Sequence, residues 1–333
     1  MPSTTETTVY DTFFTATIKN YSTKLEKNFL EYWAIVDALM DNYSHSDSSG
    51  GRLYQTSAEY GLNTTTKFFD GADPFSQEPA QTAQPLVYQW RYLGSTVSMT
   101  ETEMLENRGT AALWNITESR IRQAIRSMNL ILGQELYSDG TNYGGKTIIG
   151  LAAGVSTTPT VDPASGAVGG LSVTSFPFWA NNATISAGSF AANGVKGSAD
   201  DVVIRMFNNC TDGSAQRPKV IVSSQDVWEF YNRTLLGTLR YLDPTHSKAG
   251  DGSFASLEYQ GIPWRWDRLC PSGRMYFLDP EKLHLMVDPA FKFKWTPALT
   301  YPNQLAYTRI CGLRLSMAYK ARMFTGVIDG FTA

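Results

Sequence analysis

The sequence predicts an α+β fold, because separate segments carry the period of a helix and the alternation of a strand. Residues 110–137 place apolar side chains at helical spacing. The run LVYQWRYLGSTVSMTE (86–101) alternates bulky residues as a strand does. The segment PKVIVSS (218–224) predicts a buried strand. A capped helix is expected directly after it, at 223–236. These observations predict helices and strands within one chain of 333 residues, which is long enough to bury a substantial core.

The first expected element is a helix over residues 22–40, ended by the turn-forming stretch 42–51. Ser22 or Thr23 is a suitable cap for its first turn. Its apolar stripe consists of Leu25, Phe29, Trp33, Val36 and Met40.

The pattern of residues 52–103 predicts an extended two-stranded β-hairpin with bulky side chains on both faces. One face of its second strand carries Leu86, Tyr88, Trp90 and Tyr92. An isolated hairpin of this kind is marginally stable in water. We therefore expect something outside the hairpin to cover these rings.

The long helix carries its apolar residues on one side. Its stripe consists of Leu113, Ile116, Ile121, Ala124, Ile125, Met128, Leu132 and Leu136. Residues 138–197 are rich in small residues and predict loops and short strands. A capped helix is expected over 198–207. Strand-like runs follow near the end of the chain, including 291–295 and 308–324.

Composition narrows the class of function. The net charge is −3 and basic residues do not cluster, which argues against a strong grip on nucleic acid. Cys210, Cys270 and Cys311 are far apart and form no C-x-x-C pair, so we expect reduced thiols and no zinc site. The longest apolar run, 147–155, is too short to span a bilayer, and the first 14 residues do not form a signal peptide. We expect a soluble protein made in the cytoplasm.

Residues 140–147, GTNYGGKT, match the phosphate-binding pattern G-x-x-x-x-G-K-[ST]. That chemistry requires a loop that leaves a strand and enters a helix, so that backbone N–H groups converge on the phosphates. Here a helix precedes the motif, and Gly150, Gly154 and Pro159 argue against a helix after it. We interpret the match as a glycine-rich turn that ends the long helix.

Other catalytic patterns are weak. His45, His246 and His284 form no H-x-x-x-H pair, and no G-x-S-x-G elbow is present. Trp264 and Trp266 stand at strand spacing, which is more typical of a core or an interface than of a ligand platform. We predict that the protein is not an enzyme, with no catalytic, cofactor-binding or metal-binding residues and no cofactor.

Several stretches, in order, resemble the major capsid proteins of tailed bacteriophages, which share the Hong Kong 97-type fold with encapsulins. They are the junction of the long helix with LYSDGT (136–141), GGLSVTSFPFWANN (169–182), PKVIVSSQDVWEFY (218–231) and GSFASLEYQGIPWRWDRLCPSGRMYFLD (252–279). The second resembles the family's GGI-plus-Trp-Asn signature. The fourth resembles its F-x-x-L-x-Y-x-G-I-P and P-x-G-x-x-Y-F-L elements. The resemblance covers the chain from about Phe13 to Gly330.

The resemblance implies a Hong Kong 97-like division of the chain. It assigns 1–50 to an N-terminal arm, 51–105 to an extended β-hairpin loop, 106–149 to the spine helix and the start of the peripheral domain, 150–277 to the axial domain, and 278–333 to return strands and the peripheral-domain loop. It implies a structural coat protein without catalysis. Hexamers and pentamers of this protein would self-assemble into the icosahedral shell around the double-stranded DNA genome of a tailed phage.

The resemblance also implies where copies meet. The expected inter-subunit contacts are Phe13, Phe14, Phe68, Phe69, Tyr88, Trp90, Tyr92, Trp295, Tyr301 and Asn303. The expected partners are other copies of the chain. Scaffold, portal and decoration proteins are further candidate partners. The DNA is enclosed without sequence-specific binding, and no membrane is involved. The expected location is the virion, after assembly in the host cytoplasm.

Alternatives remain open at this point. An encapsulin-type compartment shell has the same fold, and the phosphate-loop match leaves a nucleotide-binding protein as a weaker possibility. A decoration or tail protein is disfavoured by the long helix. Some family members crosslink a loop Lys to an Asn; Lys67 and Asn303 are the available placements, and we do not expect the bond to form.

Overall fold

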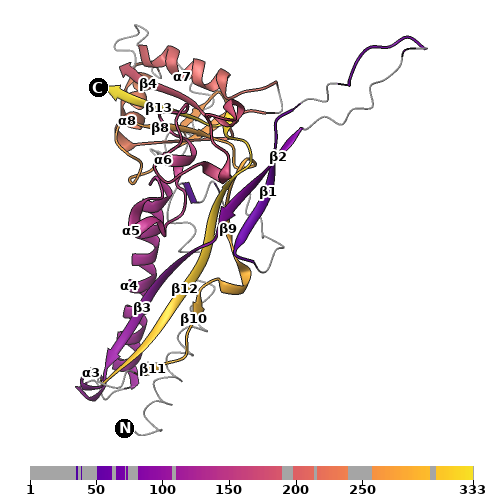
Figure 1. Ribbon diagram of the computed structural model, residues 1–333. Helices are drawn as coiled ribbons and strands as arrows, with labels where there is room; N and C mark the ends of the chain where they lie inside the picture. The colour runs from indigo at the N-terminus through magenta and orange to yellow at the C-terminus, as the bar shows by residue number, and fades with distance from the viewer. Residues whose placement is uncertain are drawn as a thin grey trace.

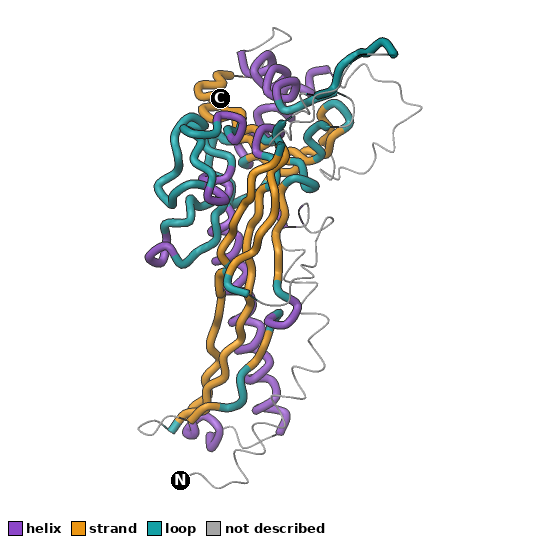
Figure 2. The backbone as a smooth tube through the Cα atoms, turned by 45° about the vertical axis from the view of Figure 1, so that its right-hand side comes forward, coloured by secondary structure: helices purple, strands orange, loops and turns teal. Residues whose placement is uncertain are grey.

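The computed structural model describes residues 35–36, 39, 51–61, 65–71, 73, 82–106, 110–189, 198–213, 216–238, 257–300 and 305–332. The molecule is elongated (Figure 1). A sheet covered by helices lies at one end. Long strands and one long helix run side by side from there to the other end (Figure 2). A hairpin projects sideways from the region where these two parts meet.

The long part is organised around β12 (Ala306–Tyr319). It pairs antiparallel with β3 (Arg91–Thr100) over ten consecutive residue pairs, from Ala306 opposite Thr100 to Leu315 opposite Arg91. Beyond Leu315 its partner is β9. The sheet is completed by β9 (Leu283–Val287), β10 (Lys294–Trp295) and β11 (Leu299–Thr300). The expected strand at 308–324 is therefore confirmed up to Tyr319, whereas only Lys294 and Trp295 of the expected 291–295 strand are extended.

A six-stranded sheet forms the other end, in the order β4-β13-β8-β5-β7-β6. The final strand, β13, pairs in parallel with β4 and antiparallel with β8. The segment 278–333 thus contributes to both sheets, because β12 belongs to the sheet of the long part and β13 to the six-stranded sheet. The strands are β4 (Asn182–Ser189), β5 (Val220–Ser223), β6 (Leu257–Tyr259), β7 (Ile262–Trp266), β8 (Met275–Leu278) and β13 (Gly326–Thr332).

The long helix is confirmed as α4 (Thr110–Leu136), preceded by the short α3 (Glu101–Glu106). The predicted helices at 198–207 and 223–236 are confirmed as α7 (Ser198–Asn209) and α8 (Gln225–Thr238). Of the helix expected at 22–40, Ile35, Val36 and Leu39 are helical and fully buried, and the others lie outside the described residues.

Short helical turns connect these elements. They are α5 (Asn142–Gly145), α6 (Leu151–Gly154), η1 (Val168–Gly170), η2 (Pro177–Trp179), η5 (Pro289–Phe291) and η6 (Arg322–Phe324). The first four lie in the segment predicted as loops and short strands at 138–197, whereas η6 lies in the run predicted as a strand at 308–324.

The hairpin predicted at 52–103 is confirmed in part. β1 (Leu53–Glu59) and β2 (Ala83–Gln89) pair antiparallel over seven residues. The run 86–101, however, is two strands separated at Trp90, because β3 leaves the hairpin to pair with β12.

This change of partner interrupts the expected alternation of side chains. Leu86, Tyr88 and Trp90 are buried, whereas Tyr92 is 66% exposed. The shared face predicted for the four residues therefore ends at Trp90.

The buried apolar residues form two cores, and the larger one extends from the long part to one face of the six-stranded sheet, through Val222, Tyr276 and Val327. The larger contains the inner faces of α4, β2, β3, β9 and β12, including Met128, Leu132 and Leu315. The smaller lies between α7, α8 and the six-stranded sheet, where Val203, Trp228 and Trp264 meet. The Trp264 indole donates a 2.7 Å hydrogen bond to the Ser223 hydroxyl. Its burial agrees with the core interpretation.

Candidate assembly surfaces

The base of the hairpin is covered by its own chain. The Tyr88 hydroxyl donates a 2.7 Å hydrogen bond to the Tyr319 carbonyl oxygen, and the ring is 1% exposed. Gly169, at φ +66°, makes this close approach possible, since a Cβ there would lie 2.8 Å from the Tyr88 hydroxyl oxygen. Burial raises the pKa of Tyr88 well above its usual value.

Trp90 is enclosed in a similar way. Its side chain is 6% exposed, with the Arg314 guanidinium carbon 4.9 Å from the ring centroid and the Tyr54 ring edge-on at 6.4 Å. Tyr88 and Trp90 are thus covered by their own chain, and their expected contact with a neighbouring subunit stays a prediction. Two of the covering residues, Arg314 and Tyr319, lie more than 200 positions along the sequence, so strand alternation cannot reveal them.

The far end of the hairpin is open. We call residues 65–71 and Asp73 the hairpin tip. Phe68 is 105% exposed and Phe69 is 62% exposed. The Asp70 carboxylate accepts a 2.9 Å hydrogen bond from the Gly71 N–H, and the Asp73 carboxylate accepts one of 3.3 Å from the Asp70 N–H. Both Phe side chains keep the exposure that a contact with another copy requires.

Tyr92 lies on the outer side of the hairpin base. Its ring meets Phe291 edge-on at 5.8 Å, and the Arg314 guanidinium carbon lies 5.7 Å from its centroid. Arg314 also forms a 2.7 Å ion pair with Asp288 and donates to the Gly51 carbonyl. The exposed ring of Tyr92 is therefore fixed in place and available for contact.

Trp295 is the one remaining candidate that the structure describes. Trp295 is half-buried in β10, opposite Cys311 of β12. Tyr301 and Asn303 lie outside the described residues, as do Phe13 and Phe14. The structure therefore places Trp295 beside the middle of the β3–β12 ladder, since Cys311 pairs with Ser95. Its contact with another copy stays a prediction.

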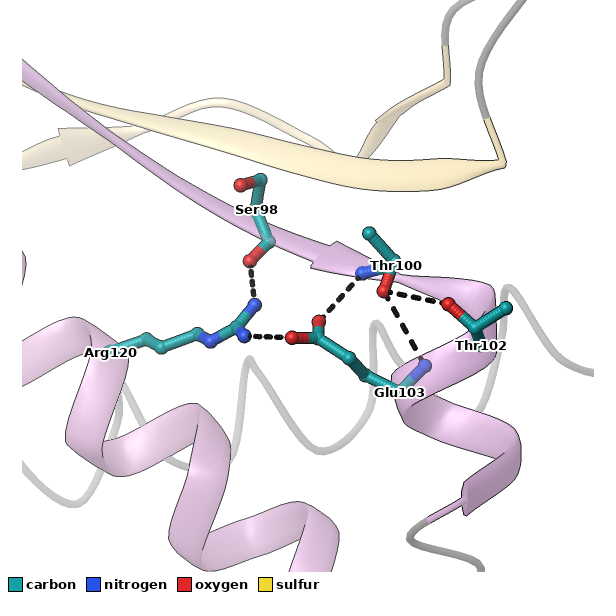
Figure 3. Close-up of polar contacts among 5 residues, drawn as sticks. All are labelled: Ser98, Thr100, Thr102, Glu103 and Arg120. Atoms are coloured by element: carbon teal, nitrogen blue, oxygen red, sulfur yellow. Dashed lines mark hydrogen bonds and ion pairs between the residues drawn. The ribbon is translucent and has the colours of Figure 1, made fainter.

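A polar network joins β3, α3 and α4 at the end of the molecule opposite the six-stranded sheet (Figure 3). Arg120 of α4 forms a 2.5 Å ion pair with Glu103 and donates to the Ser98 carbonyl. Glu103 accepts a 3.1 Å hydrogen bond from the Thr100 N–H. These contacts, above all the hydrogen bond from Arg120, lower the pKa of Glu103. The sequence analysis missed this network. Glu103 and Arg120 are 17 residues apart on different helices, and neither helical nor strand periodicity relates residues at that distance.

The phosphate-loop match lies in a turn, as predicted. α4 ends at Leu136 and α5 follows, with Tyr143, Gly144 and Gly145 all at positive φ. No strand leads into the motif, and the next helix, α6, has four residues. The geometry that gathers N–H groups on a phosphate is therefore missing from this described segment.

Signs of a catalytic centre are sparse in the described part of the chain. No group of three or more His, Cys, Asp or Glu side chains is arranged to hold a metal ion there. Cys210, Cys270 and Cys311 are reduced and buried. Trp266 is 41% exposed on β7. Among the described helices, none combines the length and apolar character needed to cross a membrane.

Solved structures with the same architecture come from capsids and compartment shells. The cyanophage A-1(L) capsid asymmetric unit matches with a TM-score of 0.64 and 16% identity, over 90% of this chain and 92% of that one. The procapsid of satellite phage P4 gives 0.52 and 10%, over 93% and 91%. The holo-SrpI encapsulin complex from Synechococcus elongatus PCC 7942 gives 0.51 and 11%, over 87% and 84%.

The chain has the Hong Kong 97-type capsid fold. No protein-family description and no curated protein sequence matches it. The capsid fold is therefore evident from the arrangement of its elements, at sequence identities too low for the sequences alone to match.

Proposed function

We propose that this chain is the major capsid protein of a tailed phage. Copies of it would form hexamers and pentamers, and these would close into an icosahedral shell around double-stranded DNA. One observation carries the proposal. The similarity to the cyanophage capsid chain extends over 90% of this chain and 92% of the other, so the likeness is to a whole shell subunit.

In this proposal the parts of the fold have separate roles. The long sheet and α4 act as the peripheral domain and spine. The six-stranded sheet with α7 and α8 acts as the axial domain around the capsomer centre. The hairpin is the extended loop that lies on a neighbour, and residues 1–50 are the N-terminal arm. The protein would be structural, without catalysis, and would reach the virion after assembly in the host cytoplasm.

The exposed apolar side chains support association between copies. Phe68, Tyr92 and Leu305 are 105%, 66% and 70% exposed, and they lie on different parts of the molecule. Burying each of these side chains against another copy removes apolar surface from water. Contacts at several separate places also reinforce one another, so that a subunit held by all of them dissociates slowly.

Electron microscopy of the purified protein tests the proposal. We expect closed, hollow particles when the chain is produced alone or together with proteins encoded beside it. Deletion of residues 64–84 removes the hairpin tip and keeps Leu86 and Tyr88 in the core. We expect this variant to give a folded monomer or capsomer that does not close into shells. A monomeric full-length chain under all these conditions, or normal particles from the deletion, would contradict the proposal.

A second candidate is the shell of an encapsulin-type compartment, which the similarity to the SrpI encapsulin complex favours. The contents of purified particles separate the two functions. Packaged double-stranded DNA, or particles that carry a portal protein at one vertex, support the phage capsid. A specific enzyme enclosed in particles free of DNA supports the compartment.

A further inference from the structure

Two adjoining pockets lie beside the base of the hairpin, between β3 and the turn that follows α4. Their volumes are about 440 Å³ and about 290 Å³. Arg91, Tyr92 and Lys146 line both, so the two pockets form one depression, which we call the cationic groove.

The first half of the groove is positively charged. Arg52, Arg91, Lys146 and Arg314 line it. Arg314 is neutralised by Asp288 at 2.7 Å. Among the described residues, Arg52, Arg91 and Lys146 form no ion pair with a carboxylate. Three positive charges around one pocket favour an anionic occupant.

The second half of the groove is apolar. The rings of Tyr92 and Tyr143, each 66% exposed, stand at its rim. Its aliphatic lining consists of Leu93, Ile131, Leu132, Ile148 and Leu315. Its one acid, Glu135, already accepts hydrogen bonds from the Ser138 hydroxyl at 2.8 Å and the Asn142 amide at 3.1 Å. The groove as a whole therefore suits an apolar side chain next to carboxylates.

The hairpin tip has the matching chemistry. It carries Phe68 beside Asp70 and Asp73, whose two negative charges outweigh the one positive charge of Lys67. Neither carboxylate has an ion pair with a described residue. The tip cannot reach the groove of its own chain. Gln89 lines the groove, and six residue steps separate its partner Leu53 from Glu59 at the distal end of the hairpin. That is about 20 Å at ~3.3 Å per residue, and the tip projects further outward (Figure 1).

We infer that the cationic groove of one copy receives the hairpin tip of a second copy. Asp70 and Asp73 face Arg91 and Lys146, and Phe68 enters the apolar half beside Tyr92. The inference rests on the proposed shell function and specifies which surface the hairpin occupies. It also assigns a binding function to Lys146, which the phosphate-loop match had singled out.

Disulfide crosslinking tests this pairing. Gly71→Cys places a thiol on the tip, where a Cβ meets nothing within 4 Å, and Gln89→Cys places one in the groove. The three native cysteines are buried. A disulfide requires Cα atoms within about 7 Å, so the two new thiols of one chain cannot join. We expect oxidised particles of the double variant to give a ladder of covalent oligomers on a non-reducing denaturing gel.

The matched control combines Gly71→Cys with Leu130→Cys, on the exposed face of α4, where the side chain is 45% exposed. We expect no ladder from this pair. Particles that assemble but give no ladder with Gln89→Cys, or give one with the control only, would overturn the inference and leave the shell function standing. A chain that forms no particles at all would instead contradict the shell function.

Charge reversal provides an independent readout. Arg91→Glu with Lys146→Glu should lower the yield of particles about tenfold or more, since like charges then face each other. Asp70→Lys with Asp73→Lys should do the same. The chain with all four substitutions should regain most of the yield. Arg126→Glu with Arg205→Glu, at exposed positions of α4 and α7, is the matched control and should leave the yield unchanged. Failure of the fourfold variant to recover, with each pair folded by circular dichroism, would contradict the pairing.

Discussion

The base and the tip of the hairpin carry the same kind of side chain in opposite surroundings. At the base, Tyr88 is 1% exposed and its hydroxyl is bonded to the Tyr319 carbonyl. At the tip, Phe68 is 105% exposed. The base is therefore part of the subunit's own core, whereas the exposed tip is the part that we propose contacts another copy. An aromatic strand face does not by itself indicate an interface, since part of it is shared with the chain's own core.

The largest contrast is expected when each of the two rings is removed. Tyr88→Ala should lower the free energy of unfolding by about 3–5 kcal/mol, because it leaves a cavity and an unpaired Tyr319 carbonyl. Phe68→Ala should change it by less than about 0.5 kcal/mol, because nothing in the subunit packs on an exposed ring. Urea denaturation of the unassembled protein measures both. If both variants lose the same free energy of unfolding, the base and the tip do not differ in their contribution to the stability of the subunit.

A contrast of intermediate size involves two glycines. At Gly154 a Cβ would lie 1.9 Å from the Tyr319 ring, and at Gly71 it would meet nothing within 4 Å. Gly154→Ala should therefore cost about 1–3 kcal/mol through overpacking next to the base of the hairpin. Gly71→Ala should shift stability by less than about 1 kcal/mol. Thermal unfolding of both variants checks the pair, and a neutral Gly154→Ala would show that the Tyr319 site can relax.

The smallest effect concerns Glu103 at the far end of the long sheet. Arg120 holds its pKa below the usual value, so its stabilising contribution is complete above the pKa of the unfolded chain and is lost as the pH falls through the folded pKa. Because the pair is partly exposed, Glu103→Gln should cost about 0.2–1 kcal/mol at pH 7. The difference from the parent should shrink as the pH falls below 4.5. A difference that does not change with pH would exclude the ion pair as its source.

The elements with a strong local period could be predicted from the sequence. The stripe from Ile121 to Leu136 predicts α4, and the alternation around Tyr88 predicts a strand of the hairpin. The short segment at 220–223 is buried at every position, as an apolar run between turns indicates.

Features that depend on distant partners could not be predicted. Trp90 marks the point where the chain changes from the hairpin to β12, yet no turn residue stands there. Arg52, Lys146 and Arg314 come together from three separate segments. Their individual positions in the sequence give no basic cluster, so the groove exists only in the folded chain.

The ten-pair ladder between β3 and β12 has a mechanical consequence. Its hydrogen bonds run perpendicular to the strands, so tension along the molecule's long axis loads them all at once in shear. Force applied across the strands would instead open them one after another. In the proposed shell, a wall built from such subunits would resist stretching along this axis better than peeling at its ends.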